Sequence, residues 1–121
     1  MRFGTGFKQG DIVIVPFPSS DLSSAKQRPV LVLSNDRYNA STEDIVTCGL
    51  TSNLKDSDYS LLVGKQNLSE GDIPTKSRIR VDKIFTIEQS LIRKSIGRVN
   101  EESFSKVQKE ILRLFSYAQK D

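Results

Sequence analysis

One short segment of the chain, SRIRVDK over residues 77–83, places groups that can handle a phosphate at every second position. If the segment is an extended strand, Arg78, Arg80 and Asp82 share one face, because side chains alternate along a strand. The forked guanidinium of Arg matches phosphate oxygens, and the carboxylate of Asp can accept a proton. The ordinary alternative is a solvent-exposed strand face whose charges pair with one another. The segment therefore predicts either a phosphate site or a solvated face.

A second candidate is the stretch KQRPVLVLSND, residues 26–36, in which Lys26 and Arg28 stand at the end of a Ser-rich loop. Pro29 follows and fixes the backbone where an apolar run begins. A rigid backbone at this point would hold the Arg28 guanidinium still, which favours the stabilisation of developing charge. Many strands begin in the same way, so this pattern alone leaves both interpretations open.

Two hydroxyl residues, Thr51 and Ser52, close the apolar segment DIVTCGLTS (44–52). They could orient a phosphate, although hydroxyls are common at strand ends and turns. The chain contains no His, which excludes a Ser–His or Cys–His dyad and a His-containing zinc site. The single cysteine, Cys48, lies in an apolar run and is expected in the core. One cysteine excludes an internal disulfide and fits a reducing cytosol.

Short strands are expected to position these residues, because turn residues bound several runs rich in β-branched side chains. The predicted strands are GDIVIVPFP (10–18), PVLVLS (29–34), DIVTCGLTS (44–52), YSLLVGK (59–65) and SRIRVDKIFTI (77–87). The continuous apolar run PVLVLS is typical of a strand covered on both faces. Loops are predicted over 18–27 and 66–76, and a turn with one helical turn over 34–42. Strands of this length and spacing predict a small barrel.

The carboxy-terminal segment has a helical period instead. Asn100 is a suitable N-cap, and Glu101 and Glu102 fall in the first turn, where the helix dipole favours acids. Apolar residues then recur at helical spacing, namely Phe104, Val107, Ile111, Leu114, Phe115 and Ala118. This pattern predicts one amphipathic helix whose apolar stripe packs on the barrel.

Composition and charge narrow the classes of partner. A chain of 121 residues fits one domain, over 1–121, and nine aromatic residues without Trp predict a modest core that a homodimer could complete. Residues 76–98 contain seven Lys or Arg and two acids, a net +5, while the whole chain has +3. This favours a polyanion or an acidic peptide as partner, with a solvated basic face as the alternative. The first 20 residues fit neither a signal peptide nor a membrane span, so a cytoplasmic protein is expected.

Taken in order, the segments GDIVIVPFP, QRPVLVLSND, GLTSN and SRIRVDKIFTI resemble the MazF/PemK (Kid) family of toxins from type II toxin–antitoxin modules, over nearly the whole chain. The resemblance implies a mainly β fold with a C-terminal helix, a small SH3-like β-barrel of the MazF/PemK/CcdB type, and a homodimer. It also implies an endoribonuclease without metal or cofactor that cuts single-stranded RNA at short sequences, leaving a 2′,3′-cyclic phosphate and a 5′-hydroxyl. The implied partner is a cognate antitoxin whose acidic segment covers the RNA groove.

Carried over by position, the resemblance assigns catalysis to Arg28 of the RP motif, Thr51, and Arg80 and Asp82 of the R-x-D motif. In this scheme Asp82 takes the proton of the 2′-hydroxyl, although two neighbouring Arg should lower its pKa. Arg28 and Arg80 stabilise the phosphate, and Thr51 orients it. RNA contacts are expected from Lys26, Gln27, Ser52, Arg78 and Lys83.

Some features depart from the family pattern, among them the loop before the RP motif, which lacks the Gly and Glu spacing of the best-known MazF-like enzymes. The loop 18–27 has no His before the RP motif, so Lys26 or Gln27 would have to replace it, and Lys83 stands where many members carry Gln. Two other functions therefore stay open: a CcdB-like gyrase poison, and a basic module that binds RNA or protein without catalysis. The RP, TS and R-x-D positions favour the nuclease.

Overall fold

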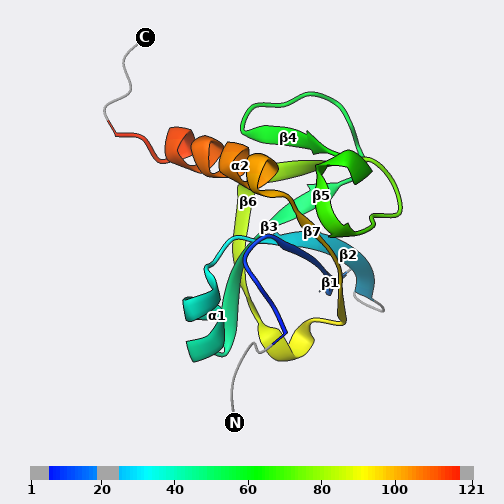
Figure 1. Cartoon of the computed structure of the whole chain (residues 1–121), viewed down its shortest axis with the longest axis vertical. Coiled ribbons are helices and arrows are strands. Elements are labelled where there is room, and N and C mark those ends of the chain that lie inside the picture. The colour runs from blue at the N-terminus through cyan, green and yellow to red at the C-terminus, as the bar shows by residue number, and fades with distance from the viewer. Residues whose placement is uncertain (1–5, 19–24, 118–121) are drawn as a thin grey trace.

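Seven strands form one antiparallel sheet in the computed structural model, which describes residues 6–18 and 25–117 (Figure 1). The strands are β1 (Asp11–Pro18), β2 (Ala25–Val32), β3 (Asp44–Thr51), β4 (Ser60–Val63), β5 (Leu68–Gly71), β6 (Ser77–Glu88) and β7 (Lys94–Val99). Their order across the sheet is β4-β6-β3-β2-β1-β7-β5. The sheet curls into a half-barrel, and the predicted mainly β fold with a C-terminal helix is confirmed.

Two α-helices and two short 3-10 helices complete the described chain: α1 (Asp36–Ser41), η1 (Lys65–Asn67), η2 (Gln89–Leu91) and α2 (Glu101–Leu114). The helical turn predicted within 34–42 is α1. The sheet and α2 lie against each other (Figure 1), and α2 contacts β4 and β6. No helix of the described residues has the length and apolarity needed to cross a membrane.

The start of α2 follows the prediction, whereas its end does not. The Asn100 side chain accepts a hydrogen bond from the backbone N–H of Ser103 at 2.9 Å. Val107 is fully buried, and the core also receives Phe104 and Ile111. Phe115 is 69% exposed, so its predicted place in the apolar stripe is wrong. The reason is that α2 ends at Leu114, and the backbone of Phe115 has already left the helical conformation. Ala118 lies outside the described residues.

One strand begins earlier than predicted, and two strands were not predicted. β2 begins at Ala25, within the predicted loop 18–27, of which residues 19–24 lie outside the described part of the chain. β5 falls inside the predicted loop 66–76, and β7 occupies a stretch where no strand was predicted. Gly71 and Gly97 pair between these two strands, and glycine weakens the strand signal in a sequence. Gly71 has φ 77°, and an added Cβ would lie 2.3 Å from the Ile96 carbonyl oxygen.

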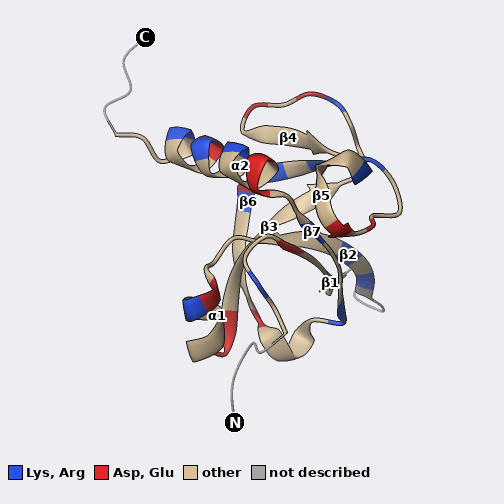
Figure 2. Ribbon diagram, viewed as in Figure 1, with Lys and Arg blue, Asp and Glu red and all other residues tan. Residues whose placement is uncertain are grey.

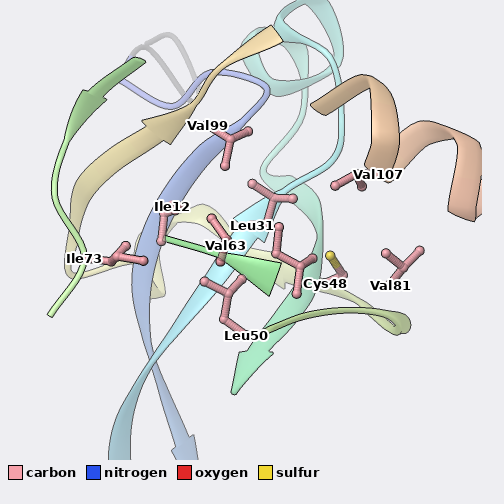
Figure 3. Packing of buried hydrophobic residues seen from close by; sticks show 10 residues of the cluster. Ile12, Leu31, Cys48, Leu50, Val63, Ile73, Val81, Val99 and Val107 are labelled. Atoms are coloured by element: carbon pink, nitrogen blue, oxygen red, sulfur yellow. The ribbon is translucent and has the colours of Figure 1, made fainter. Parts of the chain in front are cut away.

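The apolar run of β2 serves both faces of the curled sheet, as predicted. Leu31 packs with Ile12, Cys48, Val81 and Val107 on one face (Figure 3). Val30 and Val32 belong to the cluster on the other face, together with Val13, Val15 and Ile45. Cys48 is buried, also as predicted, and this burial raises the pKa of its thiol to about 12.

A bulge in β6 separates its core residues from the candidate site. Cys48 pairs with Ile84, but the next residue of β3, Gly49, pairs with Arg80, so residues 81–83 loop out of the ladder. Val81 still fills the core, and its backbone N–H donates to the Tyr59 carbonyl at 2.9 Å. The bulge therefore turns the following two residues outward, where both are exposed.

Candidate active site

A groove of three adjoining cavities runs along β2, β3 and β6. The first, of about 500 Å³, is lined by Arg28, Thr51, Arg80 and Lys83 among apolar neighbours. The second, of about 220 Å³, is lined in part by Gln27, Arg28, Thr51 and Ser52. The third, of about 270 Å³, is lined in part by Thr51, Arg78 and Arg80. Thr51 lines all three cavities and therefore lies at the centre of the groove.

Arg28 is exposed on β2 beside an aromatic wall. Its guanidinium carbon lies 6.0 Å from the ring centre of Phe17, at the limit of a cation–π contact. Phe17 in turn meets Phe85 edge to face, with ring centres 5.4 Å apart. Both rings line the first cavity, where nucleobases could stack on them. Neither ring was predicted from the sequence as part of the site. The available signal was the position of each aromatic residue near the basic motifs.

Arg80 and Asp82 form a bidentate pair. The Arg80 Nε donates to Asp82 Oδ1 at 3.1 Å, and Nη2 donates to Oδ2 at 3.0 Å. The contact shows that the two side chains share a face, as strand alternation predicted. The hydrogen bond from Arg80 is the main cause that lowers the pKa of Asp82. Arg80 lines the groove, whereas Asp82 is not among its lining residues and supports Arg80 from the side.

Arg78 differs from its neighbours on β6 because its side chain is only 8% exposed. Its Nη1 donates to Ser60 Oγ at 3.0 Å, and Nη2 donates to the Leu54 carbonyl at 3.4 Å. An ion pair of 3.4 Å joins Nη1 to Asp56. The alternative of a solvent-exposed strand face is therefore wrong at Arg78. Through these contacts Arg78 also connects the loop 53–58 to the groove.

The other predicted RNA contacts lie at different places. Lys83 and Ser52 are exposed at the first and second cavities, and Gln27 lines the second. Lys26 stands opposite Phe17 in the β1–β2 ladder and is not among the residues that line the groove. Thr51 also shapes the next loop, because its hydroxyl accepts a hydrogen bond from the Asn53 N–H at 3.1 Å.

The groove is strongly basic. Among its described lining residues are five cations and one carboxylate: Arg28, Lys55, Arg78, Arg80, Lys83 and Asp56. Figure 2 shows basic stretches on β2 and β6, the two strands that supply the three arginines. This excess of positive charge suits a polyanion. Within the described ranges, no three His, Cys, Asp or Glu residues cluster as metal ligands. That RNA cleavage needs no metal ion stays a prediction.

A family model described as the PemK-like, MazF-like toxin of type II toxin–antitoxin systems matches residues 8–115. The chain belongs to this family. The predicted PemK/MazF membership is thereby confirmed, on a match that spans the groove and both α-helices. No curated protein matches the chain.

Solved structures share the PemK/MazF fold at low sequence identity. A mycobacterial endoribonuclease in complex with its cognate antitoxin is 18% identical, with a TM-score of 0.74, over 95% of this chain and 100% of its own. A MazE–MazF structure from Deinococcus radiodurans is 18% identical, with a TM-score of 0.72, over 91% and 95% of the two chains. The Mycobacterium tuberculosis toxin MazF-mt6 is also 18% identical, with a TM-score of 0.72, over 90% and 99%.

Proposed function

We propose that this PemK/MazF-like toxin is an endoribonuclease that cuts single-stranded RNA at a short sequence without a metal ion. The observation that carries the proposal is the first cavity, which is lined by the guanidinium residues Arg28 of β2 and Arg80 of β6 together with the hydroxyl residue Thr51. The mycobacterial structure that shares the fold is an endoribonuclease, which supports the same activity.

The reaction proposed is transfer of the phosphate to the neighbouring 2′-oxygen. The O2′–P bond forms and the P–O5′ bond breaks, which leaves a 2′,3′-cyclic phosphate and a 5′-hydroxyl. Negative charge grows on the five-coordinate phosphorus, and the fixed donors of Arg28 and Arg80 stabilise it. Thr51 orients the phosphate between them. DNA cannot react in this way because it lacks the 2′-hydroxyl.

Asp82 is the proposed acceptor of the 2′-hydroxyl proton. While Arg80 donates to it, its lowered pKa makes it a weak base. When RNA binds, the phosphate competes for the Arg80 donors. Each hydrogen bond that Arg80 transfers to the phosphate raises the basicity of Asp82, so substrate binding and activation of the base are coupled. Water in the open groove supplies the proton that the leaving 5′-oxygen takes up.

The same basic groove is the proposed binding site for the cognate antitoxin. Five cations against one carboxylate suit an acidic segment of that protein, which would compete directly with RNA. The mycobacterial and Deinococcus structures that share this fold contain an antitoxin or MazE, which supports such a partner. We further propose that the toxin acts as a homodimer in the cytoplasm.

The decisive experiment incubates the purified protein and its Arg28→Ala variant with a long single-stranded RNA, with Mg²⁺ or with EDTA. The new 5′ ends are mapped, and the products are tested for a cyclic phosphate. We expect cuts at one short motif by the unmodified protein in both buffers, and none by Arg28→Ala. Arg37→Ala, which removes an exposed Arg from the remote helix α1, is the matched control and should cut normally.

The same experiment separates the alternatives. A folded protein that cuts no RNA would refute the nuclease, and cleavage only with Mg²⁺ would refute metal independence. Inhibition of gyrase by a protein that does not cut RNA would support the CcdB-like function. Binding of RNA without any product would support a basic module that lacks catalysis.

A further inference from the structure

The third cavity of the groove has the composition of an anion site. Its lining residues are Thr51, Asn53, Lys55, Asp56, Ser57, Arg78 and Arg80. Three of these are cations and one is a carboxylate. The cavity shares Thr51 and Arg80 with the first cavity, so an extended polyanion can pass from one to the other.

Arg78 forms a buried wall of this cavity, and its hydrogen-bonding capacity is incompletely used. A guanidinium carries five N–H donors. The described residues accept one hydrogen bond from Arg78 at 3.0 Å and one at 3.4 Å. Its Nε is buried and has no acceptor within the described part of the chain. Because a buried cation needs full pairing, Arg78 is suited to a further anionic partner.

Asp56 supplies only a weak partner to Arg78. The pair spans 3.4 Å, and the Asp56 side chain is 93% exposed. Ion pairs of this kind contribute little because water solvates the exposed carboxylate. The loop has other ties that do not depend on Asp56. Asn53 Oδ1 accepts from the Lys55 N–H at 3.0 Å, and the hydroxyls of Ser57 and Ser60 lie 3.0 Å apart. Asp56 can therefore leave Arg78 without loss of these contacts.

We propose that the third cavity binds an RNA phosphate next to the scissile one, and that Asp56 occupies this site in the free protein. The inference rests on the proposed RNA cleavage for its biological ligand. The incoming phosphate offers two charged oxygens to the Arg78 donors, and Lys55 adds a charge at the exposed rim. Since Arg78 also holds the Leu54 carbonyl, exchange of Asp56 for phosphate couples RNA binding to the loop 53–58.

A matched pair of variants tests the role of Asp56. Asp56→Asn and Asp58→Asn each remove one negative charge from the same loop, but Asp58 does not line the cavity. The probe is a random-sequence single-stranded DNA, which offers phosphates and cannot be cut by the proposed reaction. We expect Asp56→Asn to bind it about threefold to fivefold more tightly than Asp58→Asn does. Equal affinities of the two variants would overturn the proposal.

A second pair tests the phosphate contact through its salt dependence. Lys55→Gln should reduce the slope of log affinity against log salt by about 0.7, the value for one phosphate contact on a single strand. Lys106→Gln, on the exposed side of α2, should leave the slope unchanged. Equal slopes for both variants would also overturn the proposal. Because this probe reports binding alone, a nuclease that fails to cut RNA is distinguished from an anion site that fails to bind.

Discussion

Asp82 accepts two hydrogen bonds from Arg80, at 3.1 Å from Nε and at 3.0 Å from Nη2. Both residues belong to the same bulged segment of β6, so the backbone of one strand sets the geometry of the pair. A bidentate pair fixes the plane of the guanidinium as well as its position. The proposed chemistry depends on this pair and on Arg28, which reaches the same cavity from β2.

Replacing Asp82 with Asn should reduce kcat/KM for RNA cleavage by at least about 100-fold, because a general base contributes 10²–10⁴-fold. Arg80 lowers the pKa of Asp82 in the free protein. The acidic limb of the pH profile of kcat/KM should therefore lie below pH 3.8 for the unmodified protein. The measurement is a pH–rate profile on the mapped RNA, with circular dichroism to show that the variant folds. A loss of less than about tenfold would mean that Asp82 only positions Arg80.

The same pair predicts a pH dependence of stability. A carboxyl whose pKa is lower in the folded state stabilises the fold at pH values above its unfolded pKa. This contribution disappears as the pH falls through the lowered pKa. Asp82→Asn should therefore have a lower Tm than the unmodified protein at pH 7, and the two Tm values should converge as the pH falls well below 3.8. A Tm difference that is independent of pH would contradict this linkage.

Arg28→Lys should reduce the kcat of cleavage about 100-fold, because the compact ammonium of Lys replaces the planar, forked guanidinium at the phosphate. Arg28 is exposed, so the fold should tolerate the change and the Tm should stay within about 2 °C. Arg37→Lys on α1 is the control for the chemical change itself. Near-normal cleavage by Arg28→Lys would remove Arg28 from the proposed mechanism.

Cys48 should resist thiol reagents in the folded protein at pH 8, because burial raises its pKa to about 12 and the thiolate is the reactive form. Labelling should become fast once the chain is unfolded in guanidinium chloride. The raised pKa also predicts that the contribution of Cys48 to stability is full below pH 9.0 and is lost as the pH rises toward 12. Rapid labelling under native conditions would show that the core around Cys48 opens readily.

Gly71→Ala should lower the free energy of unfolding by at least about 2 kcal/mol, because a side chain at φ 77° is strained and its Cβ would lie 2.3 Å from the Ile96 oxygen. Urea denaturation measures the effect. Gly6→Ala is the matched control, since an added Cβ there meets nothing within 4 Å. If the two variants were equally stable, β5 and β7 would have to move apart more easily than their close packing in the structure indicates.

Periodicity along one strand was enough to predict the face shared by Arg80 and Asp82, because alternation is a local property of the backbone. The burial of Arg78 could not be predicted in this way. Its partners, Ser60 and Leu54, belong to segments far away in the sequence, and no local pattern shows that they meet. The same limit applies to the Phe17–Phe85 wall, which joins β1 to β6 across two intervening strands.

Local sequence signals also explain why the strands β5 and β7 were not predicted and why the end of α2 was misplaced. β5 and β7 carry the glycines at which they approach each other, and glycine depresses the strand signal that apolar alternation would give. The helical spacing of Phe115 continues the stripe of α2, but the helix ends one residue earlier, so the side chain never reaches the sheet. Tertiary contacts decide where such a period stops, and they are absent from a local window of sequence.

The interleaving of charged and apolar residues along β6 has an evolutionary consequence. Arg78 and Arg80 belong to the groove, while Ile79 and Val81 belong to the core. An insertion or deletion of one residue here would exchange the two sets and drive charge into the interior. Changes in the length of β6 should therefore inactivate the protein. Functional descendants of the gene should change this strand only by substitutions that keep its alternation, while length variation accumulates in exposed turns away from the groove.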